Sequence, residues 1–305
     1  MLGSAFAVPV VAQRSASSTV FSSVFSPEVP ASVTLCGKTI DLDRADLYER
    51  FDRELSSLAY THGTTMLIIK RANKYFPEMA PILKANGVPM DLLYLACVES
   101  SLNPRAYSPA KAAGFWQFIA SAAKEYGLEV NDEVDERYDI EKATAAAAKY
   151  LKKSYQRFGD WSSAMAAYNG GNARIGKELD AQGADTSLDL YLTEETTRYP
   201  FRVMAMKAIL ENPAAYGFKL RNDQLYQPRT YRIVEVSTPV ESWPDWAKSQ
   251  GINYQLLREE NPWIRSKKLT NKTGKTYKVR IPTPESMSRK ANPGKTYNPN
   301  WTVQR

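Results

Sequence analysis

The sequence predicts a mainly α-helical protein that ends in a small β-α-α-β domain. Apolar residues recur at three- and four-residue spacing over 46–59 and 64–73, which is typical of amphipathic helices. Before Pro228 no segment alternates apolar and polar residues convincingly. After it, 231–236 and 277–282 alternate and are β-branched, as in strands. Two short helical stretches, 243–250 and 254–261, separate these strands.

Capping residues set the bounds of the other predicted helices. Pro77 and Pro81 punctuate the second helix, Asp139 and Asp160 are N-cap candidates, and Gly159 ends the helix between them. The further helices are expected at 87–99, 114–127, 141–158, 161–168 and 201–211.

Five segments follow from these patterns. Residues 1–35 form a signal-like or disordered N-terminus, in which 2–12 has the apolar run and small-residue cleavage site of a secretory signal without its basic start. Export to the periplasm or cell envelope is therefore expected. The segments are 1–35, a helical extension packed on the main domain (36–80), the main helical domain (81–220), the β-α-α-β module (229–285) and a disordered tail (286–305).

The positive charge is concentrated in the last quarter of the chain. The 305 residues carry a net charge of +7, yet 229–305 holds 15 Lys and Arg against 6 Asp and Glu. Such a module suits an anionic wall polymer or membrane surface, although it also fits a plain solvated domain. Nucleic acid is not expected as a partner.

The sequence contains few cysteines and histidines. It has two cysteines and one histidine, His62, so it lacks a Cys/His zinc cluster, and a Ser-His-acid triad would depend on a histidine with no nucleophile motif beside it. Cys97 fits a core position, and no disulfide with Cys36 is predicted. Neither a metal nor an organic cofactor is expected.

An uncharged stretch, 92–98, leads directly to Glu99. A carboxyl at the end of a buried helix is partly desolvated and near the negative end of the helix dipole, and both effects raise its pKa. A general acid that works near neutral pH needs such a pKa. The alternative is a glutamate that simply faces water at a helix end.

The chain contains four short motifs whose order along the sequence matches that of a known protein family. They are Glu99-Ser100 followed by Leu-Asn-Pro, Gly114-Phe-Trp-Gln117, Ala167-Tyr-Asn169 and Glu195-Thr-Thr-Arg-Tyr199. Over about 80–212 the chain resembles the lytic transglycosylases (the SLT domain, glycoside hydrolase family 23), and Trp116 is typical of the D-type members. Phe115, Pro200 and the Gly171-Asn172 pair depart from the usual pattern.

This resemblance implies a lysozyme-like catalytic domain that cleaves the MurNAc-(β1→4)-GlcNAc bond of peptidoglycan glycan strands. A protonated Glu99 would donate to the leaving oxygen and then, as a base, activate the C6 hydroxyl, giving a 1,6-anhydroMurNAc end. Tyr199 would position or polarise Glu99, and Glu195 would be structural. The implied substrate contacts are Ser100, Gln117, Tyr168, Asn169, Tyr199 and Trp116, the last either stacking on sugar or lying in the core.

Two other functions stay open. In a lysozyme-type hydrolase a second carboxylate would direct water, and the acidic run after the Gly-x-x-Gln motif offers candidates. A non-catalytic wall-binding protein would need no desolvated glutamate. The candidates for a second carboxylate are Asp132, Glu133, Asp135, Glu136, Asp139 and Glu141.

The C-terminal module resembles LysM, a small glycan-binding domain. The carriers of this likeness are Asn261-Pro262, Gly274 and the closing strand 279–282. The Gly-Asp-Thr-Leu turn usual after the first strand is replaced by Ser-Thr-Pro-Val at 237–240. The fold is therefore expected, whereas its usual contacts with N-acetylglucosamine are in doubt.

Overall fold

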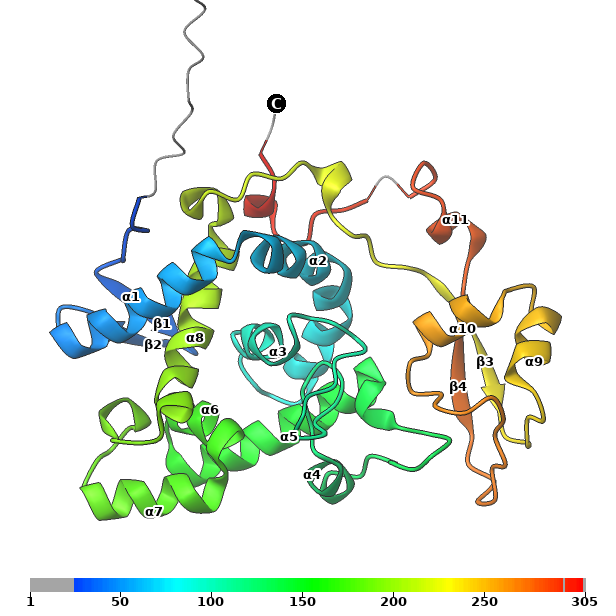
Figure 1. Cartoon of the computed structure of the whole chain (residues 1–305), viewed down its shortest axis with the longest axis horizontal. Coiled ribbons are helices and arrows are strands. Elements are labelled where there is room, and N and C mark those ends of the chain that lie inside the picture. Colours follow the sequence, from blue (N-terminus) through cyan, green and yellow to red (C-terminus); the bar gives the residue numbers. More distant parts are fainter. Residues whose placement is uncertain (1–24, 293, 304–305) are drawn as a thin grey trace, which may run out of the picture.

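A computed structural model describes residues 25–292 and 294–303 of the chain. The signal-like run 2–12 lies outside these residues. Helices dominate the rest, as predicted, and small two-stranded sheets lie near either end (Figure 1). In the described ranges no helix is both long and apolar enough to cross a membrane.

The first element is a hairpin that the sequence did not reveal. Strands β1 (Ser32–Leu35) and β2 (Lys38–Asp41) pair antiparallel around a turn in which Cys36 and Gly37 have positive φ. The expectation of no strand before residue 228 is therefore wrong. Strands of only four residues are too short for an alternation of apolar and polar residues to be recognised. The side chains of Val33, Leu35 and Ile40 are buried in the main core.

The helix α2 (His62–Ala85) continues through both of its prolines. The predicted helix at 64–73 is therefore too short, because Phe76, Met79 and Leu83 are fully buried and hold this segment in the core. Tertiary packing offsets the backbone hydrogen bonds that proline removes.

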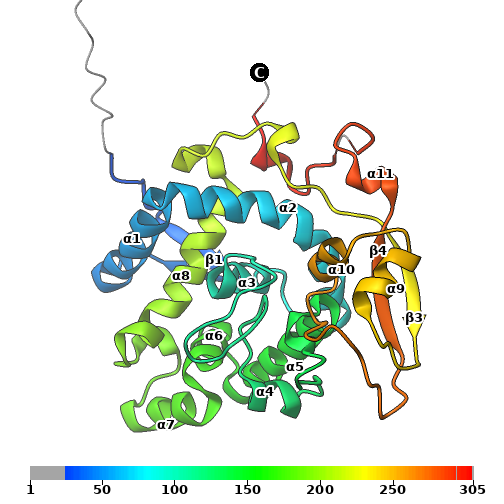
Figure 2. The ribbon, with the colours of Figure 1, turned by 45° about the vertical axis from the view of Figure 1, so that its right-hand side comes forward.

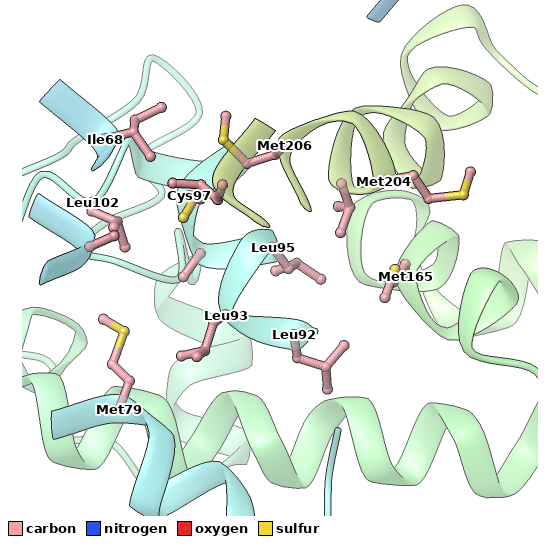
Figure 3. Close-up of a cluster of buried hydrophobic side chains, with 14 of the residues drawn as sticks. Ile68, Met79, Leu92, Leu93, Leu95, Cys97, Leu102, Met165, Met204 and Met206 are labelled. Carbon is pink, nitrogen blue, oxygen red and sulfur yellow. The ribbon is translucent and has the colours of Figure 1, made fainter. Parts of the chain in front are cut away.

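Helix α3 (Leu92–Ser100) lies in the middle of the main domain. The views of Figures 1 and 2 show it enclosed by α2, α5, α6 and α8. Figure 3 shows the leucines of α3 and Cys97 among buried methionines of its neighbours. The other helices are α1 (Ala45–Tyr60), α4 (Ala120–Glu125), α5 (Ile140–Phe158), α6 (Trp161–Gly170), α7 (Asn172–Gln182) and α8 (Glu194–Glu211).

Capping was a good guide to α5 and α6. Asp139 accepts hydrogen bonds from the first turn of α5, Gly159 ends that helix at φ +66°, and Asp160 caps α6. Helix α4 is shorter than predicted and α7 was not predicted. Helix α8 begins seven residues earlier than expected and contains Pro200.

The C-terminal module has the predicted β-α-α-β order. Strand β3 (Tyr231–Val236) pairs antiparallel with β4 (Tyr277–Pro282), and α9 (Trp243–Ser249) and α10 (Tyr254–Glu260) lie between them in the chain. Its core includes Trp243, Leu257 and Val279, all fully buried.

The tail returns to the main domain instead of being disordered. After the short helix α11 (Pro284–Met287) it passes α2, where the Tyr297 N–H donates to Asn73, and reaches α8, where the Nε1–H of Trp301 donates to the Leu210 carbonyl. Trp301 is buried edge-to-face on Phe76. The expectation of disorder over 286–305 is therefore wrong for the described part of this segment, because one buried tryptophan outweighs its Pro- and Asn-rich composition.

Candidate active site

Glu99 is the next-to-last residue of α3, and this helix is otherwise apolar and largely buried. Burial raises the pKa of the Glu99 carboxyl from 4.5 to about 7. Donation from the Tyr199 hydroxyl lowers this pKa, the charge of Glu195 raises it, and that of Arg202 lowers it. The balance leaves a carboxyl that is substantially protonated at neutral pH.

Tyr199 lies on α8, the long helix that packs against α3. Its side chain is 2% exposed and its hydroxyl donates to Oε1 of Glu99. Burial and the adjacent carboxylate hold the pKa of Tyr199 well above its ordinary value. The tyrosine therefore remains a donor and fixes the orientation of the carboxyl group.

Glu99 opens into a groove of about 790 Å³. Its walls come from α3, α6, α8 and the loop between α3 and α4. Five of the predicted site residues line it together: Glu99, Gln117, Tyr168, Asn169 and Tyr199. The structure thus brings together residues that are up to a hundred positions apart in sequence.

Gln117 lies in a strained turn. Its φ is +49°, and its side-chain Nε2 donates to the Gly114 carbonyl at 2.8 Å. Gly114 has φ +76°, and a Cβ on it would be 1.9 Å from the Arg137 carbonyl oxygen. Only glycine permits this backbone approach. The predicted helix at 114–127 is replaced here by this turn, and α4 starts only at Ala120.

Arg137 stabilises the same turn through hydrogen bonds to its backbone. Its buried guanidinium binds the Asp135 carboxylate through two hydrogen bonds and donates to the carbonyls of Lys111 and Phe118 at 2.8 and 3.0 Å. The position of Gln117 therefore depends on a buried ion pair outside the groove.

Tyr168 and Asn169 come from the C-terminal turn of α6. The Tyr168 hydroxyl donates to the Trp116 carbonyl at 2.7 Å. The side-chain Oδ1 of Asn169 accepts a hydrogen bond from Thr196 Oγ1 at 2.9 Å, and its Nδ2 donates to the Glu195 carboxylate at 3.3 Å. Both side chains are therefore oriented before any ligand binds.

Two predicted contacts do not reach the groove. Trp116 is fully buried, and its Nε1–H donates to Thr144 at 2.9 Å, so it packs the core and has no face for a sugar. Ser100 is 8% exposed, and its hydroxyl donates to the Ala96 carbonyl within α3. Neither residue lines the groove in this structure, and for Trp116 this fits the core position, one of the two that the sequence left open.

None of the acidic residues proposed after the Gly-x-x-Gln motif lines the groove. Five of the six form contacts elsewhere: Asp135 with Arg137, Glu136 with Lys142 and Lys275, Glu133 with Thr270, Asp139 at the N-terminus of α5, and Glu141 with Arg280. The second carboxylate in the lining is Glu195, which is exposed.

Arg202 was not among the predicted site residues. It lines the groove three residues after Tyr199, and its Nε donates to the buried Glu54 of α1 at 3.1 Å. The i, i+3 spacing on one helix face was the available signal. Helix α1 thus contributes to the site by orienting a cation that acts on Glu99.

Within the described residues no group of three His, Cys, Asp or Glu side chains is arranged to hold a metal ion. Cys36 and Cys97 are both free.

Comparison with known families gives two matches. Residues 78–189 match the transglycosylase SLT domain, and residues 232–285 match the C-terminal LysM-like domain of soluble lytic transglycosylases. These matches confirm the resemblance drawn from the four motifs and from the β-α-α-β pattern.

Curated relatives extend the similarity. The chain is 33% identical over 226 residues to the membrane-bound lytic murein transglycosylase D of Escherichia coli strain K12, and equally to that of strain CFT073. The match covers 72% of this chain and 48% of the relative, so the chain spans about half the length of these proteins.

Two solved structures are similar over a smaller part. The 70 kDa soluble lytic transglycosylase of Escherichia coli is 23% identical with a TM-score of 0.37, covering 43% of this chain and 24% of that one. An inactive mutant of the lytic transglycosylase Slt from Pseudomonas aeruginosa is 18% identical with a TM-score of 0.37, covering 45% and 24%.

Proposed function

We propose that this chain, with its SLT domain at residues 78–189, is a lytic transglycosylase of bacterial peptidoglycan. The observation that carries the proposal is a glutamate with a pKa of about 7, bound by a buried tyrosine at the wall of an open groove. A group with that pKa can give up and take back a proton at neutral pH.

The proposed reaction has two steps. Protonated Glu99 donates to the glycosidic oxygen between MurNAc and GlcNAc as the bond breaks, and an oxocarbenium-like centre develops at C1. The ionised Glu99 then accepts the proton of the C6 hydroxyl, whose oxygen closes onto C1 to give the 1,6-anhydro sugar. The carboxyl returns to its protonated form without water entering the product.

The polar side chains of the groove support this sequence of steps. Gln117 and Asn169 offer amide groups for the N-acetyl and hydroxyl groups of a glycan, and Tyr168 adds an aromatic wall. Tyr199 keeps Glu99 in place in both protonation states because its hydroxyl donates throughout. We expect export to the cell envelope, where this polymer lies.

A hydrolytic alternative is favoured by one observation. Glu195 lines the same groove, and its charge raises the pKa of Glu99. A second carboxylate directing water onto C1 would make the protein a lysozyme-type muramidase. Against this role, Glu195 already accepts a hydrogen bond from Asn169 at 3.3 Å.

Mass spectrometry of muropeptides released from purified peptidoglycan distinguishes these functions. Transglycosylation gives products that are one water lighter than those with a reducing MurNAc end. We expect Glu99→Gln to lower release by roughly 10²- to 10⁴-fold, the usual contribution of a general acid, while binding to sacculi persists. Reducing ends from the wild type would instead show a hydrolase.

The Glu195→Gln variant is the matched control. It should retain the anhydro product and most of the activity. Undiminished release by Glu99→Gln would remove Glu99 from the mechanism, and binding without release by the wild type would leave a wall-binding protein.

A further inference from the structure

Two cations of the C-terminal module are paired with carboxylates of the main domain. Lys275 binds Glu129 and Glu136 at 2.8 Å, and Arg280 binds Glu78 at 2.6 Å and Glu141 at 2.7 Å. These cations hold the module in place. These two cations are therefore not free to bind an anionic partner.

A second groove, of about 900 Å³, lies between α2 and the C-terminal tail. Its walls come from α2, the turn after α3, the linker to the module and the tail. We call it the basic groove, after the six cations that line it: Arg71, Lys74, Arg105, Arg229, Arg289 and Lys290. Among the described residues that line it, Asp223 is the single acidic one, and its carboxylate is bound by Arg221.

Most of this charge is uncompensated. Of the six cations, Arg229 alone has an ion pair among the described residues, with Glu260. Arg71 donates to the Ser101 carbonyl and Arg289 to the Asp223 carbonyl, both at 3.0 Å, and these contacts cancel no charge. Cations gathered in a concave surface attract anions more strongly than the same cations dispersed on a convex one.

Lys74 reports the resulting electrostatic environment. Its burial, Arg229 and Arg280 lower the pKa of its ammonium to about 8, while Glu78 and Glu259 act in the opposite direction. Lys74 has no ion pair among the described residues, and its ammonium lies 5.1 Å from the centre of the Tyr75 ring, so no paired opposite charge offsets its partial burial. An anion in the groove would remove this cost.

The arrangement of the cations indicates the charge of the anion. Single arginine forks bind a carboxylate at Arg137–Asp135 and Arg221–Asp223, and three arginines surround the carboxylate of Glu54. The basic groove draws its cations from four separate segments. A phosphate group carries up to two negative charges and three acceptor oxygens, so it neutralises more of these cations than a single carboxylate does.

We propose that the basic groove binds a phosphate-bearing anion, either a lipid headgroup or a soluble phosphate chain. The loop after α3 lies between the two grooves. Its residues 103–105 line the basic groove, and its residues 108–110 line the groove of Glu99. A bound anion would therefore lie beside the catalytic groove without entering it.

The proposal is tested with the full chain and defined probes. Inorganic tripolyphosphate is titrated by calorimetry, and flotation compares phosphatidylglycerol with phosphatidylcholine vesicles. The groove variant replaces Arg71, Lys74 and Arg289 by Gln. The matched control replaces Lys84, Lys177 and Lys278 by Gln; these lysines are exposed and line neither groove.

We expect the groove variant to bind tripolyphosphate at least tenfold more weakly than the wild type, and the control variant to bind as the wild type does. Retention on phosphatidylglycerol that follows the same pattern would identify the lipid headgroup as a source. Binding of tripolyphosphate alone would identify a soluble chain. Melting temperatures close to the wild-type value show that the variants are folded.

Three results would overturn the proposal. One is equal weakening in both triple variants, which would mean that only net charge matters. Another is binding of poly-glutamate as tight as that of tripolyphosphate, and the third is no binding of either phosphate probe. Acylation of Lys74 at pH 8, followed by mass spectrometry, locates the site: tripolyphosphate should protect this lysine. None of these measurements uses the glycan-cleaving activity, so their failure is separate from that of the proposed function.

Discussion

Glu99 combines a catalytic requirement with a cost in stability. Its carboxyl pKa is about 7 in the folded protein and 4.5 in a solvated chain, so the folded state binds this proton more tightly. The stabilisation is fully present below pH 4.5 and is lost as the pH rises through 7. Above that pH, folding must hold a carboxylate in a poorly solvated position.

We therefore predict that Glu99→Gln stabilises the protein at alkaline pH. The gain in unfolding free energy over the wild type should grow between pH 4.5 and 7 and reach about 3 kcal/mol, since each unit of pKa shift corresponds to about 1.4 kcal/mol. Denaturant titrations across this pH range measure it. Glu285→Gln, at an exposed position, is the control. A gain that is independent of pH would contradict the assigned cause.

Tyr199 should set the alkaline limit of activity. Its donated hydrogen bond lowers the pKa of Glu99, so Tyr199→Phe should raise that pKa further. Activity that needs protonated Glu99 would then persist to higher pH, while the maximal rate falls about tenfold because the carboxyl is less well oriented. The pH dependence of glycan release measures both effects.

Tyr168→Phe is the matched comparison for this prediction. Its hydroxyl donates to the Trp116 carbonyl and not to Glu99. We expect this variant to lose rate without moving the alkaline limb. A Tyr199→Phe profile that falls at the wild-type pH would show that the hydrogen bond does not tune Glu99.

At this scale the sequence was informative where a motif has a fixed spacing. Glu99 and Tyr199 were predicted as partners and do form a hydrogen bond. Trp116 was open between sugar and core because an aromatic residue beside a motif fits both environments. Arg202 was missed because it follows the last motif and its effect depends on Glu54, a residue of another helix.

Among the elements, the turn that carries Gln117 depends most on a single backbone contact. We predict that Gly114→Ala destabilises the protein by about 1–3 kcal/mol more than Gly127→Ala. Both glycines have positive φ, at +76° and +83°, so both substitutions incur similar backbone strain. Only at Gly114 would the new Cβ meet a backbone oxygen at 1.9 Å, and such overpacking adds its own cost.

Thermal unfolding of the two alanine variants measures this difference. Activity should follow it, because displacing the 114–118 turn moves Gln117 in the groove, whereas Gly127 ends α4 with open space around it. Equal destabilisation of the two variants would show that the turn yields without cost.

Element boundaries were predictable where local chemistry decides them. Asp139, Gly159 and Asp160 placed the ends of α5 and α6, and their capping geometry is present. The extension of α2 through Pro77 and Pro81 could not be predicted, because it depends on the packing of Phe76 and Met79 against other helices. The short β1–β2 hairpin has too few residues to show a period.

On the scale of the whole molecule, the acidic run after the Gly-x-x-Gln motif joins the two domains. Glu133 accepts from Thr270, Val134 forms a bridge with Ile264, and Asp135 donates its backbone N–H to the Trp263 carbonyl at 2.9 Å. The next residues continue to Arg137, which braces the turn of Gln117. The sequence could not show this docking, because the ion pairs of Lys275 and Arg280 join residues more than a hundred positions apart.

We therefore predict that reversing the docking charges releases the C-terminal module. Lys275→Glu combined with Arg280→Glu would place carboxylates against Glu129, Glu136, Glu78 and Glu141, converting attraction into repulsion at partly buried positions. Limited proteolysis of the linker around 226–230 should become at least threefold faster. Glycan release should also fall, because the module holds Asp135, the partner of Arg137, through the Trp263 carbonyl.

The control for this reversal is Lys278→Glu. It changes the charge on the same strand, β4, but at an exposed side chain that has no ion pair among the described residues. Hydrogen exchange should then rise over 129–138 in the double variant and stay at the wild-type level in the control, because only the double variant removes the partners of this segment. Unchanged exchange in both variants would mean that the apolar contacts around Trp263 and Val134 are sufficient to hold the module, and that the ion pairs only select its orientation.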